Sequence, residues 1–160
     1  MLRVTLLCVG KCKERYWRDA CAEYEKRLGG FCRFQLIEVD EERAPEQPSP
    51  AQIEAIVQAE GKRLLDKLPA GAYPVALCIE GKPLASPELA ARMQKLSVEG
   101  VSHLAFIIGG SWGLSPAVKQ TARWHLSMSP MTFPHQLARV MLLEQIYRGF
   151  QIAGGGKYHK

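Results

Sequence analysis

Two short segments of this chain, 75–79 and 104–108, consist entirely of apolar residues. Strands that are hydrophobic on both faces are typical of parallel sheets covered by helices on both sides. Each segment is bounded by turn-forming residues, and the stretches around them space their apolar residues as helices do. The chain therefore predicts an α/β fold, in which a parallel sheet is flanked by helices.

The rest of the chain continues this alternation of strand and helix. We expect strands at 2–9, 31–39, 75–79, 104–108 and 124–128, and helices at 14–28, 49–68, 86–97, after 115–116, and at 134–152. Ser-Pro pairs at 49–50, 86–87 and 115–116 predict helix starts, with serine as the N-cap and proline at the first helical position. No repeat or linker divides the 160 residues, so a single domain is expected.

Charge is distributed unevenly along the chain. Residues 1–35 contain eight Lys/Arg against four Asp/Glu, residues 36–68 four against eight, and residues 69–160 nine against four. The net charge of +5 is weak evidence for a nucleic-acid partner, but a polyanion would meet the two basic ends. No apolar run is long enough for a membrane span, and the first nine residues lack signal-peptide features, so a cytoplasmic protein without membrane contact is expected.

The five cysteines do not predict a metal site. No Cys-x-x-Cys pair occurs, and the four histidines lie far from most of the cysteines in sequence. Zinc sites need four convergent nitrogen or sulfur ligands with characteristic spacing. Reduced, mostly buried thiols and no bound metal are therefore the expectation.

The last helix, 134–152, is apolar nearly all the way round. A helix on one face of a sheet needs an apolar stripe of only about 100°. Since a chain of this size offers the helix one sheet face, we expect its other side to pack against a second copy. The pattern thus favours a homodimer.

Two loops in the last third of the chain each follow a strand and lead into a helix. The first contains Gly109, Gly110 and Gly113, and the second, 127–133, is stiffened by Pro130 and followed by Pro134. Glycines let a ligand approach backbone groups closely, and prolines hold a loop ready for binding. Neither a P-loop nor a dinucleotide-binding glycine motif is present. A backbone-rich site of this kind suits adenine and amino-acid moieties and needs no metal.

Several segments together resemble the bacterial RlmH family. They are 107–115 (Ile-Ile-Gly-Gly-Ser-Trp-Gly-Leu-Ser), 131–148, the terminal Tyr158-His159-Lys160, and also Gly81-Lys82-Pro83 and Val9-Gly10-Lys11. The resemblance spans the chain and implies a single SPOUT methyltransferase domain over residues 1–160, with a C-terminal trefoil knot. It also implies a homodimer that uses S-adenosyl-L-methionine to methylate N3 of a pseudouridine in 23S rRNA of the large ribosomal subunit.

Candidate site residues follow from the resemblance by position. It places cofactor contacts at Leu77, Gly109, Gly110, Met128, Ser129, Pro130, Met131, Thr132 and Phe133. Catalytic candidates are the residues that could move a proton or hold the base: His135, Arg139, Tyr158 and His159. Candidates for rRNA phosphate contacts are Lys11, Lys13, Arg15, Arg18 and Lys82.

Alternatives remain open for some of these roles. His135 could be a helix-start histidine bonded to backbone, and Arg139 could bind phosphate, the base carbonyl or an acid of a partner subunit. The family usually has proline before the terminal Tyr-His, whereas Lys157 follows three glycines here, so a more flexible tail is expected. A SPOUT enzyme acting on tRNA or another rRNA nucleotide, or a non-catalytic ribosome-binding module, would also fit.

Overall fold

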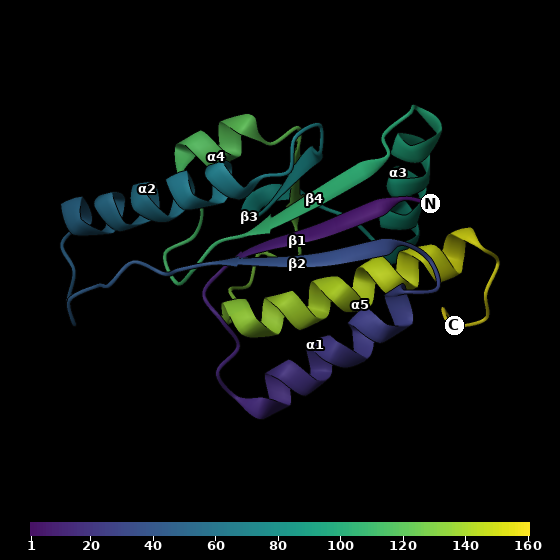
Figure 1. Ribbon diagram of the computed structural model, residues 1–160, viewed down its shortest axis with the longest axis horizontal. Helices are drawn as coiled ribbons and strands as arrows, with labels where there is room; N and C mark the ends of the chain where they lie inside the picture. The colour runs from purple at the N-terminus through teal and green to yellow at the C-terminus, as the bar shows by residue number, and fades with distance from the viewer.

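Five strands alternate with five helices along the chain in the computed structural model, which describes residues 1–160 (Figure 1). The elements are β1 (Arg3–Val9), α1 (Arg15–Leu28), β2 (Arg33–Val39), α2 (Pro50–Lys67), β3 (Tyr73–Pro83), α3 (Ser86–Val98), β4 (His103–Ile108), α4 (Pro116–Thr121), β5 (Trp124–Ser127) and α5 (His135–Ala153). This is the order predicted from the sequence.

All strand pairs in the sheet are parallel, and the strand order is β2-β1-β4-β3-β5. The two strands that contain the wholly apolar segments, β3 and β4, occupy interior positions. β2 lies at an edge, and most of its residues are exposed or half-buried. The predicted α/β class with a parallel sheet is confirmed, and the trefoil knot stays a prediction.

Helices cover both faces of the sheet (Figure 1). Successive residues of β1 point to opposite faces, so Leu6 packs in the core under α1, α3 and α5, and Leu7 in the core under α2 and α4. Both side chains are fully buried, which stabilises the fold by about 1.5–3 kcal/mol for each leucine. All residues of β4, and all of β1 except Arg3, are buried. Both strands are therefore held on both faces, and the loops at their carboxyl ends start from fixed positions.

Two of the three predicted serine caps are confirmed. The Ser49 hydroxyl accepts a hydrogen bond from the Gln52 amide, and that of Ser115 accepts one from the Val118 amide, each at 3.2 Å. The cap at 86–87 was wrong by one residue. The N-cap is Ala85, whose amide donates to the Glu88 carboxylate at 3.1 Å. Ser86 instead donates its hydroxyl hydrogen to the Gln145 side chain at 2.6 Å, which ties α3 to α5.

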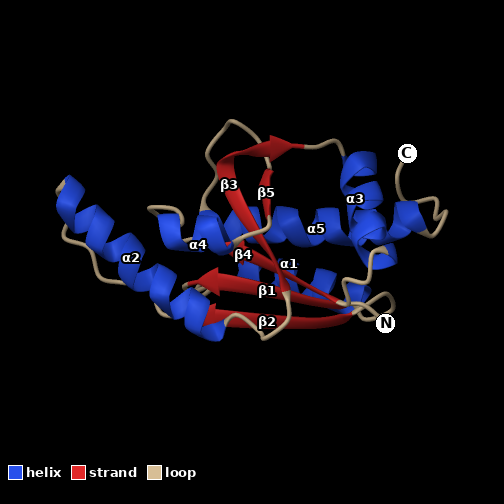
Figure 2. Cartoon of the chain, turned by 90° about the horizontal axis from the view of Figure 1, so that it is seen from above, coloured by secondary structure: helices blue, strands red, loops and turns tan.

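The terminal helix α5 is covered on more sides than the sequence suggested. Every residue from His135 to Ile152 is buried or half-buried. In addition to the sheet, α1 and α3 contact α5 from two sides (Figure 2). The premise that one protomer offers the helix only a sheet face was therefore wrong. Apolar residues such as Leu137 and Met141 remain half-exposed, and the homodimer stays a prediction.

The five cysteines are all free thiols, as expected, and all but Cys78 are buried. No group of three or more His, Cys, Asp or Glu side chains is placed to hold a metal ion. Among the helices, none combines the length and the apolar composition that crossing a bilayer requires.

Buried thiols make stability depend on alkaline pH. Burial raises the pKa of Cys8 from 9.0 to about 12. Between these values the unfolded chain loses this proton and the folded chain keeps it, so the free energy of unfolding falls as pH rises above 9. The expected slope is about 1.4 kcal/mol per pH unit for such a thiol. Urea unfolding at pH 8 and pH 10 measures it, and Cys8→Ala, although less stable throughout, should show a smaller loss between the two. Identical losses of unfolding free energy in the wild type and in Cys8→Ala would show that Cys8 is not the source of this pH dependence.

Candidate functional site

A cleft of about 870 Å³ opens at the carboxyl ends of β3 and β4 and beside the loop that joins β5 to α5. Its volume lies in the range of small-molecule sites. Three segments form its walls: the end of β3, the loop after β4 and the loop before α5. In a parallel α/β sheet this is the edge where ligands bind.

The wall formed by β3 exists because the strand is irregular. Leu77 and Lys82 both pair with Leu126 of β5, so the residues between them leave the regular ladder. In Figure 2, β3 bends before its arrowhead. Gly81 lies so close to β5 that a Cβ atom there would stand 2.8 Å from the carbonyl carbon of His125. β3 thus runs from Tyr73 to Pro83, beyond the predicted 75–79.

The glycines after β4 serve the loop's own turn. A Cβ atom on Gly109 would lie 2.6 Å from the carbonyl carbon and oxygen of Gly113. Gly113 has φ +83° and donates its amide hydrogen to the Gly110 carbonyl at 3.1 Å. The sequence analysis assigned these glycines to the close approach of a ligand and did not predict this backbone contact. Gly109 lets the backbone close on itself, and the closed turn lines the cleft.

The loop before α5 presents unpaired backbone donors. The Ser127 hydroxyl donates to the Ser129 carbonyl at 3.2 Å, and the Met131 amide donates to the Ser129 hydroxyl at 3.0 Å. The amides of Ser129, Thr132 and Phe133 have no acceptor within the chain. Such groups can bind a ligand without moving first.

Eight of the nine predicted cofactor residues line this cleft: Leu77, Gly109, Gly110, Met128, Ser129, Met131, Thr132 and Phe133. Pro130 does not, and its ring is exposed. The structure therefore brings the three predicted segments together around one space, and Pro130 shapes the loop without facing it.

Sequence reasoning named only one residue of the apolar rim of the cleft, Met131, and missed Ile79 and Trp112. Ile79, Trp112 and Met131 are 54%, 44% and 71% exposed, and all three line the cleft. Large apolar side chains gathered on a surface mark a binding site more often than chance exposure. The position of Trp112 inside the glycine loop was the available signal. Lys119 and Glu80, which form an ion pair at the rim, were also missed, and this pair lowers the pKa of Glu80.

His135, the first residue of α5, lines the cleft and is half-buried. Its side chain forms no hydrogen bond within the chain, and a Cβ atom on Gly10 would lie 3.8 Å from its Nε2 atom. Burial, and secondarily the charge of Arg139, lower the pKa of His135, whereas Glu41 acts in the opposite direction. The imidazole is therefore neutral at pH 7 and able to accept a proton.

Arg139 lies behind the cleft and does not line it. The residue is 2% exposed; it donates from Nη1 to the Glu38 carboxylate at 2.7 Å and from Nη2 to the Gly10 carbonyl at 3.1 Å. These bonds tie α5 to the ends of β1 and β2. A guanidinium so enclosed holds Gly10 beside His135 and does not reach a phosphate or a base. Arg139 is thus a positioning residue in this structure.

Tyr158 and His159 dock beside the second half of α5, and neither lines the cleft. The Tyr158 hydroxyl donates to the Glu144 carboxylate at 3.1 Å, and its ring centroid is 4.9 Å from that of Tyr147. The His159 ring nitrogen is 3.2 Å from the Arg148 guanidinium. Thirteen helical residues separate Arg148 from His135, which is about 20 Å. Within one protomer the tail does not reach the cleft.

The glycines before the tail form a defined turn, and the greater flexibility expected of this segment stays a prediction. Gly155 has φ +71°, and the Gly156 amide donates to the Gln151 carbonyl at 2.7 Å. A Cβ atom on Gly156 would overlap the Gln151 side chain. The turn directs the tail back along α5, where Tyr158 docks.

Comparison with known proteins agrees with this geometry. A family model described as predicted SPOUT methyltransferase matches residues 2–159. The chain belongs to the SPOUT methyltransferase family. Among its SPOUT relatives, the protein named ribosomal RNA large subunit methyltransferase H of Bifidobacterium adolescentis is 50% identical, with 99% of this chain and 100% of the relative covered. The protein of the same name from Clostridioides difficile is 48% identical over the same shares.

Solved structures show the same fold at low identity. A probable methyltransferase from Bordetella pertussis matches with a TM-score of 0.56 and 16% identity, over 93% of this chain and 96% of that one. A probable methylase family protein from Haemophilus influenzae matches with a TM-score of 0.53 and 14% identity, over 99% and 70%. These two structures thus share the overall fold of this chain.

Proposed function

We propose that this SPOUT protein transfers the methyl group of S-adenosyl-L-methionine to 23S rRNA of the large ribosomal subunit, at N3 of a pseudouridine. The observation that carries the proposal is the single cleft formed by three segments far apart in sequence, which include eight of the nine predicted cofactor residues. Relatives named as large-subunit rRNA methyltransferases, about half identical over their full length, support the substrate. The protein would work in the cytoplasm, with the ribosomes.

The cleft residues fit S-adenosyl-L-methionine. The unpaired amides of Ser129, Thr132 and Phe133 offer neutral donors to its adenine or carboxylate, and Leu77 and Met128 offer apolar contact. Gly110 also lines the cleft, whereas Val9 and Glu60, which a Cβ atom at Gly110 would approach, do not. When bound, the cofactor supplies an electrophilic methyl group on a sulfonium.

His135 is the residue best placed to assist the base. N3 of a pseudouridine carries a proton that must leave before or during methylation. The neutral imidazole of His135 on the cleft wall can accept it, and the amino end of α5 favours the negative charge that develops on the base. Arg139 keeps this arrangement rigid through Gly10. Catalysis then consists mainly of holding the nucleophilic nitrogen in line with the methyl group.

A homodimer is part of the proposal. Tyr158 and His159 dock on Glu144 and Arg148, about 14 and 20 Å along α5 from His135, so a catalytic tail docked in this way has to serve the cleft of a second copy. The half-exposed apolar residues of α5, Leu137 and Met141 among them, favour such a contact. Lys11, Lys13, Arg15, Arg18 and Lys82 are exposed and remain candidates for rRNA phosphate contacts.

Labelled methyl transfer tests the function. Large subunits and whole ribosomes lacking the modification are incubated with the protein and labelled cofactor, and the modified nucleotide is mapped by mass spectrometry. Label at N3 of a pseudouridine in 23S rRNA is expected. Label found only in tRNA, or only at another rRNA nucleotide, would show that this other RNA site is the substrate. Binding to ribosomes without cofactor binding in calorimetry would identify a non-catalytic module.

A further inference from the structure

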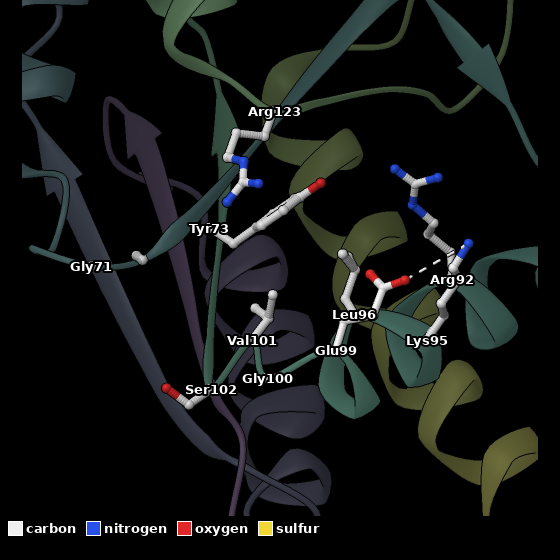
Figure 3. A pocket seen from close by; sticks show the side chains of 11 residues that line it. Gly71, Tyr73, Arg92, Lys95, Leu96, Glu99, Gly100, Val101, Ser102 and Arg123 are labelled. Atoms are coloured by element: carbon white, nitrogen blue, oxygen red, sulfur yellow. Dashed lines mark ion pairs between the residues drawn. The ribbon is translucent and has the colours of Figure 1, made fainter.

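A second cavity, of about 500 Å³, lies at the opposite edge of the sheet from the cleft. Figure 3 shows the side chains that line it. It is bounded by the starts of β3 and β4, by Arg123 just before β5, and by the second half of α3. β4 alone spans about 20 Å between the two edges, so one nucleotide cannot occupy both sites. The methyl-transfer cleft does not use this cavity.

Two arginines dominate the cavity, and neither is neutralised by an acid. The Arg123 guanidinium stacks 4.6 Å from the centre of the Tyr73 ring, as Figure 3 shows, and that of Arg92 lies 5.2 Å from the Trp124 ring. Neither guanidinium forms an ion pair. The two rings are only 8% and 7% exposed. Each arginine is thus held against a buried ring and keeps its hydrogen-bond donors free.

The other charges near the cavity are also mostly basic. Lys95 lines it and is 3.8 Å from Glu99, the one acidic residue of the lining, in a pair that is largely exposed and therefore weak. Arg3 and Arg33 face each other in register at the starts of β1 and β2, and both are exposed. The amino edge of the sheet therefore continues the positive charge of the cavity.

From this placement we propose that the cavity binds a backbone phosphate of the ribosomal RNA, away from the nucleotide that is methylated. The proposal rests on the proposed function, because only a polynucleotide substrate offers phosphates to both edges at once. Guanidiniums with free donors suit phosphate oxygens, and such contacts fix a protein's position on RNA without reading its sequence. Arg92 and Arg123 would thus orient the enzyme on the ribosome.

The test compares an Arg92→Gln/Arg123→Gln double variant with the wild-type protein in methyl transfer to ribosomes. Glutamine keeps part of the aliphatic cover over the rings and removes the charge. We expect KM for the ribosome to rise roughly tenfold in the double variant. The slope of the logarithm of the binding constant against the logarithm of the salt concentration should become shallower by about one for each phosphate contact that is lost. The kcat and the affinity for S-adenosyl-L-methionine should not change, since the cleft is at the other edge. Arg92→Lys/Arg123→Lys should restore much of the ribosome affinity, because it keeps the charge.

Lys62→Gln is the matched control, since Lys62 is exposed on α2 and has no ion-pair partner. A wild-type KM and salt slope in the double variant would overturn the inference, as would an equal effect of Lys62→Gln. Inorganic phosphate that binds to the wild type but not to the double variant, with KM unchanged, would show a small-anion site and also overturn it. No methyl transfer by the wild type to any ribosomal particle would instead contradict the proposed function.

Discussion

A Gly109→Ala variant is expected to lose S-adenosyl-L-methionine affinity by roughly tenfold to a hundredfold, which corresponds to an overpacking cost of about 1–3 kcal/mol. The added Cβ atom would stand 2.6 Å from the Gly113 carbonyl group and 3.1 Å from the Leu114 amide. Since these are backbone atoms, the turn has to open. The unpaired donors and the apolar rim would then no longer face one space. Isothermal calorimetry measures the affinity, and thermal unfolding should show a loss of stability as well.

Neighbouring glycines provide the controls. A Cβ atom on Gly110 would approach the side chains of Val9 and Glu60 at 3.1 and 3.2 Å, and these can shift. One on Gly113 would meet nothing within 4 Å, so Gly113→Ala costs only the strain of φ +83°, about 1–2 kcal/mol. Gly109→Ala should therefore reduce affinity more than Gly110→Ala. Wild-type affinity in a folded Gly109→Ala protein would show that the turn does not shape the cofactor site.

The sequence predicted the layered fold because the apolar composition of the central strands can be recognised without knowing which strands are neighbours in the sheet. Segments 75–79 and 104–108 are apolar on both faces, as is typical of interior strands under two helical layers. Val75, Ala76 and all of 104–108 are buried in this way, whereas Ile79 is exposed on the rim of the cleft. The pairing order was not predictable in this way. Parallel strands are joined by long crossovers, so the sequence places no strand beside another as a hairpin turn does.

The parts of the cleft formed by a single loop were predictable, because glycines and prolines within the loop identify it. The parts that depend on contacts between elements distant in the sequence were not. Glycines and prolines marked 109–113 and 127–133 directly. The bend in β3 was missed because Glu80-Gly81-Lys82 is typical of a turn, although the structure uses Gly81 to bring β3 back against β5. Arg139 was misjudged for the same reason: its partner Glu38 is 101 residues away, and spacing along α5 gave no sign of it.

Deleting Tyr158-His159-Lys160 is expected to lower methyl transfer by about two orders of magnitude, as the loss of a proton-transfer or base-stacking group does. Cofactor affinity should be kept because the three cleft segments hold the cofactor, and dimerisation because the apolar residues of α5 remain. Tyr158→Phe should have a smaller effect, since it loses the bond to Glu144 and keeps the ring. Single-turnover methylation of ribosomes measures the rate. A wild-type rate in the truncated protein would show that the tail has no part in the reaction.

Mixed dimers decide whether the tail serves the partner's cleft. The truncated protein keeps an intact cleft and Gly109→Ala keeps an intact tail. At a cofactor concentration that saturates the wild type but not Gly109→Ala, each variant is expected to be strongly impaired alone. If tail and cleft come from different protomers, random pairing of equal amounts gives one complete site in half of the dimers, or about a quarter of the wild-type activity. If they come from the same protomer, the mixture is no more active than the two variants alone. The docking of the tail favours the first result, because Tyr158 held at Glu144 is about 14 Å along α5 from His135 and lines no part of its own cleft.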